Sequence, residues 1–140
     1  MGKKTIPYIG GAPGTNLYEW KCFIHGPKGT PYEGGKYEIS MRFSKSYPFV
    51  PPRCQFITKI YHCNINTEGD ICLSTLKKDW KAAFGVESIL LSLYSLLSSP
   101  NPDDPLMLTI ARQYKVQKEQ HDSNAKKWTI KYAMKENAEQ

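Results

Sequence analysis

The chain has 140 residues, enough for one domain and too few for a second full one. Hydrophobic residues make up 40% and charged residues 23% of the chain, which disfavours a disordered or fibrous protein. The 19 basic and 13 acidic residues give a net charge of +6, which leaves nucleic acid or another acidic partner open. The longest apolar stretch, residues 89–97, is interrupted by polar side chains, so no membrane-spanning segment is predicted.

Turn-forming glycines and prolines dominate the first residues, so we expect an irregular lead-in over 1–16 and a single domain over 17–140. Alternation of apolar and polar residues predicts a strand over 17–25 and a second over 37–43, paired as an antiparallel hairpin. A proline-rich connector over 47–52 precedes a third strand at 53–57.

The regular spacing of apolar residues is lost for about twenty residues after residue 61. Such a long irregular stretch in a compact domain is often functional. Apolar residues at helical spacing then predict a helix over 86–97. Asp103 and Asp104 are expected to cap a second helix that continues through residue 114. A charged last helix is expected over about 116–134, and strands followed by helices predict an α+β domain.

Cys72 is the leading candidate for a reactive side chain, because it lies in the irregular middle and not in phase with a strand interior. Cys22 and Cys54 are in phase with strands, so we expect them to be buried. From the pattern alone, a reactive and a structural role for Cys72 are equally open. A protease-like mechanism is unsupported, because no triad signature surrounds the candidate bases His25, His62 and His121.

Other site types are weakly indicated. The cysteines show neither a zinc-site spacing nor a disulfide framework, so no metal is expected. The lysines of the last helix lack interleaved aromatic residues, which disfavours a nucleic-acid partner. Without an apolar signal segment, the chain is expected to be a protein of the cytoplasm, the nucleus or both, with reduced thiols.

Three motifs resemble those of the ubiquitin-conjugating enzymes: residues 61–66 (YHCNIN), 69–73 (GDICL) and 100–106 (PNPDDPL). The resemblance extends almost without gaps from about residue 17 to residue 134. It is strongest to the short class that carries ubiquitin and works with RING-type ligases. The resemblance implies an α+β fold in which a four-stranded antiparallel meander packs against C-terminal helices.

The resemblance also implies roles for individual residues. Cys72 would accept the C-terminus of ubiquitin as a thioester from the activating enzyme, ready for attack by a lysine amine. Asn64 would donate its amide to the oxyanion, brace its loop, or do both. Asp104 would orient or deprotonate the incoming lysine, while His62 and Ser74 would support the active-site loop.

Binding surfaces follow in the same way, with Phe49 and Ala82 contacting the ligase and Leu91 and Ser95 contacting folded-back ubiquitin. An exposed phenyl ring among prolines has little reason to be there without a partner, which supports the assignment of Phe49. No cofactor is expected, because ATP is consumed by the activating enzyme, and the protein is expected to be a monomer. Residues 61–110 carry three basic and six acidic side chains, a charge that suits an approaching lysine.

The sequence departs from the family pattern at several positions. Cys63 stands where the family has proline, so the loop loses a fixed φ, and oxidation could join Cys63 to Cys72 in a disulfide that blocks charging. Ser74 replaces an aspartate and Ala82 replaces a proline. The given sequence begins near where the family's basic N-terminal helix would end, and a naturally short protein and a trimmed one are both open. If that helix is absent, we expect weak charging and an altered choice of ligase. Two alternatives therefore remain open: a catalytically silent scaffold, and a carrier of a ubiquitin-like modifier.

Overall fold

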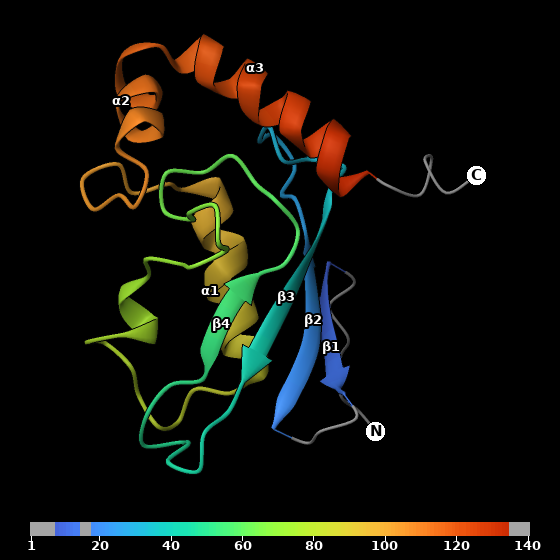
Figure 1. The fold of residues 1–140 in the computed structure, drawn as a ribbon, viewed down its shortest axis with the longest axis vertical. Coiled ribbons are helices and arrows are strands. Elements are labelled where there is room, and N and C mark those ends of the chain that lie inside the picture. Colours follow the sequence, from blue (N-terminus) through green and yellow to red (C-terminus); the bar gives the residue numbers. More distant parts are fainter. Residues whose placement is uncertain (1–7, 15–17, 135–140) are drawn as a thin grey trace.

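The structure, a computed structural model, describes residues 8–14 and 18–134. Its sheet has four antiparallel strands in sequential order: β1 (Ile9–Pro13), β2 (Glu19–His25), β3 (Lys36–Arg42) and β4 (Arg53–Phe56). Figure 1 shows them as a meander in which each strand pairs with the next along the chain. The expected four-stranded antiparallel meander is confirmed.

The helices follow the strands in the sequence. They are α1 (Val86–Ser98), α2 (Leu108–Val116) and α3 (Lys118–Trp128), with a short 3₁₀ turn, η1 (Ser74–Leu76), and a π-helical turn, η2 (Thr129–Ala133). In Figure 1, α1 lies against one face of the sheet, and α2 and α3 lie beyond one end of it. Within the described ranges, no helix is both long and apolar enough to cross a bilayer.

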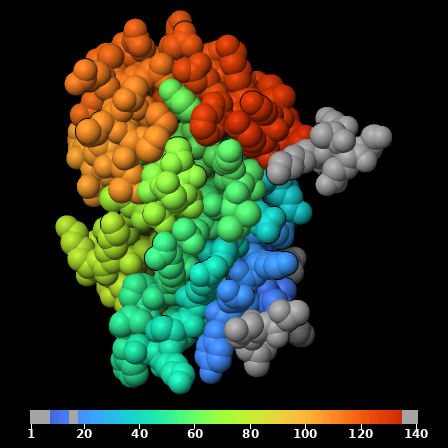
Figure 2. Space-filling model, viewed as in Figure 1, coloured from blue at the N-terminus to red at the C-terminus, as the bar shows by residue number. Residues whose placement is uncertain are grey.

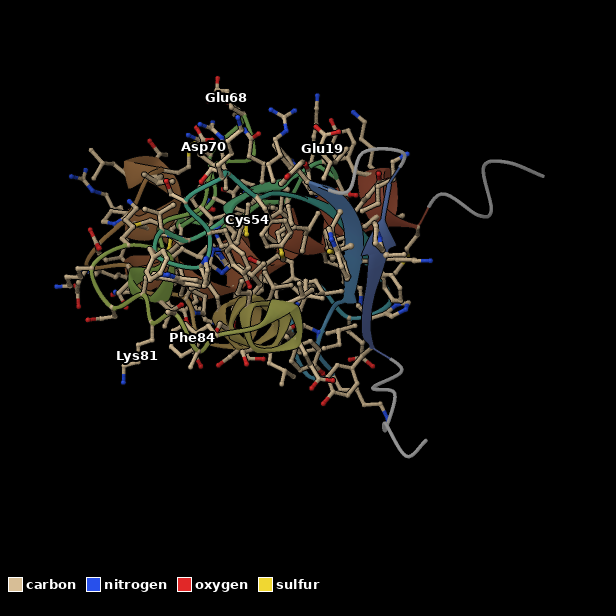
Figure 3. The ribbon with its side chains drawn as sticks, turned by 90° about the horizontal axis from the view of Figure 1, so that it is seen from below. Glu19, Cys54, Glu68, Asp70, Lys81 and Phe84 are labelled. Carbon is tan, nitrogen blue, oxygen red and sulfur yellow. The ribbon has the colours of Figure 1, made fainter. Side chains whose placement is uncertain are left out.

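The core lies between the sheet and α1. Alternate residues of β2 and β3 face inward because successive strand side chains point to opposite faces. They pack against one face of α1, on which Leu90, Leu93 and Leu97 are almost completely buried. Figure 3 shows Cys54 of β4 in this layer, whereas Glu19, Glu68 and Asp70 lie on the side of the sheet away from α1. Cys22 and Cys54 are buried, as predicted.

The N-terminal prediction needs correction, because Ile9–Pro13 form a strand and not an irregular lead-in. β1 pairs along its full length with β2, from Ile9 opposite Ile24 to Pro13 opposite Trp20. A Cβ atom on Gly10 would lie 2.5 Å from the ring of Phe23. The glycine that suggests a turn in the sequence therefore allows the close approach of two strands. Of the rest of the predicted lead-in, Tyr8 and Gly14 are described and flank the strand, and residues 1–7 and 15–16 lie outside the described residues.

The predicted cap of the second helix is also wrong. α2 begins at Leu108, and within the described structure no side chain caps it. The N–H groups of Leu106 and Met107 instead donate to the carbonyl of Cys63, at 2.8 and 3.0 Å, which holds this segment out of the helix. The last helix begins within two residues of its expected start, since α3 starts at Lys118, and η2 continues it.

Candidate active site

The candidate thiol is held by a short pairing of two irregular segments. The N–H of Cys72 donates to the carbonyl of Asn64 at 2.8 Å, and Ile71 forms an antiparallel bridge with Ile65. Both isoleucines are buried, so they anchor the two paired segments next to the thiol. Cys72 itself is only partly buried, whereas the other three cysteines are buried. The structure thus presents a single thiol at the surface.

A carboxylate lies beside this thiol, on the segment that precedes α2. The Sγ of Cys72 donates to Oδ2 of Asp104 at 3.3 Å, so the two residues that the motifs predict to work together do meet. Burial and this hydrogen bond raise the pKa of Cys72 above its ordinary value, while Lys77 opposes the shift. The resting Cys72 is therefore a protonated thiol. Figure 2 shows the orange surface around α2 bordering the yellow-green surface around η1.

The side chain of Asn64 is fully engaged within the protein. Its Nδ2 donates to the carbonyls of Asn101 and Asp104 at 2.9 and 3.0 Å, and its Oδ1 accepts from the N–H of Asn101 at 2.8 Å. The residue is 1% exposed. Both amide hydrogens are thus committed to the segment that carries Asp104, a geometry that favours the bracing role. An oxyanion role requires one of these bonds to open and stays a prediction.

His62 connects the same loop to α1. Its Nδ1 accepts from the N–H of Asn64 at 3.1 Å, so its Nε2 carries the proton and donates to the carbonyl of Leu96 at 3.0 Å. Burial lowers the pKa of His62 to about 4. The imidazole is neutral at pH 7, and both of its nitrogens are occupied. This geometry fits loop support and not a role as base.

Cys63, the departure from the family pattern, is buried under the same loop. Its Sγ donates to Oδ1 of Asn64 at 3.4 Å, and burial raises its pKa to about 11. Its carbonyl receives the N–H groups of Leu106 and Met107. All four cysteines are free, so the disulfide between Cys63 and Cys72 stays a prediction.

Ser74 begins the 3₁₀ turn that follows the thiol and is exposed. Its carbonyl accepts from the N–H groups of Lys77 and Asp79, both at 2.9 Å. This turn carries Lys77, whose positive charge opposes the rise in the pKa of Cys72. Ser74 therefore shapes the rim of the site through its backbone.

The two predicted ligase contacts lie on segments that a tryptophan joins. The indole N–H of Trp80 donates to the carbonyl of Pro48 at 2.8 Å, and its ring packs against Phe84 with centroids 5.5 Å apart. Phe49, next to Pro48, is 83% exposed, and Ala82 is exposed as well. In Figure 3, Phe84 lies at the edge of the molecule. Trp80 was not predicted to have a role, although a tryptophan in an irregular segment is a signal that it braces neighbouring loops.

The predicted ubiquitin contacts lie on the outer face of α1. Leu91 and Ser95 are one turn apart and both exposed, while the inward face of the helix is buried. Leu91 is 36% exposed, which leaves an apolar side chain available on a polar surface. The structure thus leaves both residues accessible to a partner.

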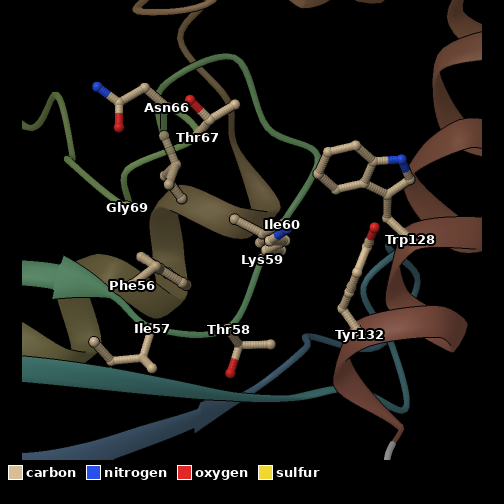
Figure 4. A pocket seen from close by; sticks show the side chains of 11 residues that line it. Phe56, Ile57, Thr58, Lys59, Ile60, Asn66, Thr67, Gly69, Trp128 and Tyr132 are labelled. Atoms are coloured by element: carbon tan, nitrogen blue, oxygen red, sulfur yellow. The ribbon is translucent and has the colours of Figure 1, made fainter.

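A separate hollow of about 130 Å³ lies between the loop after β4 and the last helical segment. Figure 4 shows Trp128 and Tyr132 forming one wall, opposite residues of the 56–69 segment. These two rings are in contact, with centroids 5.3 Å apart, but none of the predicted catalytic residues lines the hollow. In the part of the chain that the structure describes, no group of three or more His, Cys, Asp or Glu residues could hold a metal ion.

The match to known proteins agrees with this geometry. The sequence model of the ubiquitin-conjugating enzymes matches residues 3–129, which is most of the chain. The matched region contains the four strands, the segment with the partly exposed thiol, and the loop that brings Asp104 to it. The chain therefore belongs to the ubiquitin-conjugating enzyme family.

Proposed function

We propose that this protein accepts activated ubiquitin as a thioester on Cys72 and transfers it, together with a ligase, to a lysine amine. The observation that carries the proposal is the contact between a partly exposed thiol and a carboxylate, Cys72 Sγ to Asp104 Oδ2 at 3.3 Å. A thioester stores the acyl group in a form that amines attack readily. The other three thiols are buried and cannot reach a second protein.

In the charging step, Cys72 Sγ attacks the thioester carbon that joins ubiquitin to the activating enzyme. A new C–S bond forms, the bond to the activating enzyme's sulfur breaks, and that sulfur leaves as a thiolate. The proton of the Cys72 thiol leaves toward Asp104, which already accepts the hydrogen bond from it. The raised pKa of Cys72 means that this proton must be removed during the reaction and is not lost beforehand.

In the transfer step, a lysine amine attacks the thioester carbon, the C–N bond forms and the C–S bond breaks. Cys72 leaves as a thiolate and is reprotonated by the proton that the nitrogen loses as it becomes an amide. Acylation of Cys72 removes the S–H that Asp104 binds in the resting protein. Once the proton taken up during charging has passed to solvent, the carboxylate has a free oxygen to accept a proton from the incoming ammonium group. One side chain can thus serve both steps in sequence, and Asn64 holds its backbone in place.

The proposed partners are ubiquitin, an activating enzyme that consumes ATP, and a RING-type ligase that docks on Phe49 and Ala82. Ubiquitin would fold back onto Leu91 and Ser95 of α1, which are exposed. We propose that the protein works as a monomer in the cytoplasm or the nucleus and needs no metal or cofactor of its own.

The test is to incubate the protein with activating enzyme, ATP and ubiquitin, and to follow adducts by gel electrophoresis with and without reductant. We expect an adduct that reductant removes and that Cys72→Ala abolishes. Cys63→Ala is the matched control, because it removes a neighbouring thiol and should keep the adduct. No adduct with ubiquitin or with ubiquitin-like modifiers would contradict the proposal and favour a silent scaffold. An adduct with a ubiquitin-like modifier alone would identify a different cargo.

A further inference from the structure

The hollow between the loop after β4 and the last helical segment has the size of one aromatic ring. Its volume is about 130 Å³, and an apolar cavity of about 150 Å³ holds benzene. Ile57 and Ile60 contribute apolar side chains to its lining, and the rings of Trp128 and Tyr132 form one wall (Figure 4). These two rings meet edge to face, at 69°, a favourable arrangement that a third ring can extend. The hollow therefore suits an aromatic side chain.

The opposite wall is fixed before any partner binds. Oδ1 of Asn66 accepts the N–H groups of Glu68 and Asp70, at 3.0 and 2.8 Å, which closes the loop on itself. The N–H of Phe56 donates to the carbonyl of Gly69 at 2.9 Å, and a Cβ atom on Gly69 would clash with the carbonyl oxygen of Phe56. Gly69 thus allows the loop to pack directly on β4. A preformed wall needs little ordering when a partner binds, which favours affinity.

The charge at the hollow is positive. Lys59 is the only charged residue in its lining, and its ammonium lies 5.4 Å from the centre of the Tyr132 ring. The ammonium of Lys131 lies 5.2 Å from the centre of the same ring. Among the described residues, neither lysine has an acidic partner in an ion pair. Residues 126–132 carry three lysines and no acidic residue, so this surface attracts an acidic partner and repels a basic one.

We propose that the hollow binds an acidic segment of a partner protein, which inserts one aromatic side chain beside Trp128 and Tyr132 and places a carboxylate at Lys59. A polypeptide fits better than a small aromatic acid, because the surface to be covered extends beyond the hollow. Ile57 is 57% exposed at its edge, and Lys131 lies outside its lining. None of the candidate catalytic residues lines the hollow, so this inference concerns a second surface and does not rest on the proposed function.

The probe is a peptide, blocked at both ends, with a central phenylalanine and two glutamates on each side. One matched peptide has alanine at the centre, and another has lysines in place of the glutamates. Binding to the full chain is followed by two-dimensional NMR through the indole N–H of Trp128, whose signal is assigned by its loss in Trp128→Phe. We expect the phenylalanine peptide to shift this signal and to bind about tenfold more tightly than the alanine peptide, as burial of one phenyl ring allows. The lysine peptide should bind more weakly still.

Two variants test the two parts of the site. Thr67→Phe places a ring in the hollow from an exposed lining residue, and it should remove the preference for phenylalanine over alanine. Lys59→Gln should weaken binding of the glutamate peptide about threefold, as loss of an exposed ion pair does. Lys45→Gln is the matched control, because it removes the same charge from an exposed lysine outside the lining.

Equal affinities of the phenylalanine and alanine peptides for the parent protein would overturn the proposal. So would equal binding of the glutamate and lysine peptides, or equal effects of Lys59→Gln and Lys45→Gln. Benzoate is the last probe: if it shifts the Trp128 signal and the phenylalanine peptide does not, the hollow is a small-molecule site and the partner is overturned. Should Thr67→Phe fail to fold, the comparison of the two lysine variants still decides. Charging of Cys72 with ubiquitin is a separate readout, which none of these outcomes decides.

Discussion

Replacement of Asn64 by alanine removes the side chain that ties the thiol loop to the segment of Asp104. Three hydrogen bonds of 2.8–3.0 Å are lost, two donated to carbonyls and one accepted from the N–H of Asn101. At about 1 kcal/mol for each bond, the free energy of unfolding should fall by about 3 kcal/mol. For a chain of this length that corresponds to a decrease in Tm of roughly 10 °C.

The assay is urea unfolding of the parent and Asn64→Ala, followed by tryptophan fluorescence and analysed at a common m-value. Asn124→Ala is the control, because the Nδ2 of Asn124 makes two long contacts, at 3.3 and 3.4 Å, and its Oδ1 accepts one exposed hydrogen bond from Gln120 at 3.0 Å. It should lose less than about 1 kcal/mol. A bracing role for Asn64 is refuted if Asn64→Ala is as stable as the parent while its rate of transfer to lysine collapses. That outcome would assign Asn64 to the oxyanion and not to the frame of the site.

Three further predictions concern titration, thiol reactivity and ligase binding. Burial lowers the pKa of His62 from 6.5 to about 4, so the unfolded chain binds more protons between these values. The free energy of unfolding should be constant above about pH 6.5 and should fall by up to about 3 kcal/mol as the pH is lowered toward 4. Urea unfolding at several pH values tests this: if the free energy of unfolding of His62→Gln falls as steeply with pH as that of the parent, the explanation is contradicted. Iodoacetamide at pH 8 should modify native protein only at Cys72, and Asp104→Asn should speed this reaction, because it removes a carboxylate that favours the protonated thiol. If intact-mass measurements show slower labelling of Asp104→Asn than of the parent, Asp104 does not raise the pKa of Cys72. Phe49→Ala should weaken binding of a RING domain by more than about tenfold in calorimetry, as loss of an exposed aromatic anchor does, and Val50→Ala by much less.

The inner strands could be predicted from the sequence, whereas the first strand could not. β2 and β3 alternate apolar and polar residues, which is the direct signature of a half-buried strand. β1 reads Ile-Gly-Gly-Ala-Pro, a composition typical of turns. Its glycines are required by the approach of Phe23 and Cys22 on β2, a contact between segments that no local pattern reveals.

The start of α2 is likewise decided by contacts between distant segments and not by the local sequence. Asp103 and Asp104 carry a valid local cap signal, but the chain there is held by hydrogen bonds to Cys63, about forty residues earlier. The helix therefore starts at Leu108, and Asp104 is left free to face the thiol. The signal that suggested a cap in fact marked a residue of the candidate site.

The members of the candidate site could be named from motifs, but their connections could not. Cys72, Asn64 and Asp104 follow from the resemblance, and the structure brings the thiol and the carboxylate within 3.3 Å. The partners of the Asn64 amide lie 37 and 40 residues away in the sequence. Its full engagement with Asn101 and Asp104 depends on the folded loops, so only the structure distinguishes a brace from a free donor.

The most direct test of the central claim is a single-turnover chase. The protein is charged with ubiquitin, activating enzyme is removed, free lysine is added, and all species are followed by intact mass. We expect an adduct with the mass of ubiquitin less one water on the parent protein and none on Cys72→Ala. That adduct should then disappear as ubiquitin joined to lysine appears at the same rate. An adduct that persists in Cys72→Ala, or one that is lost only by hydrolysis, would contradict the account.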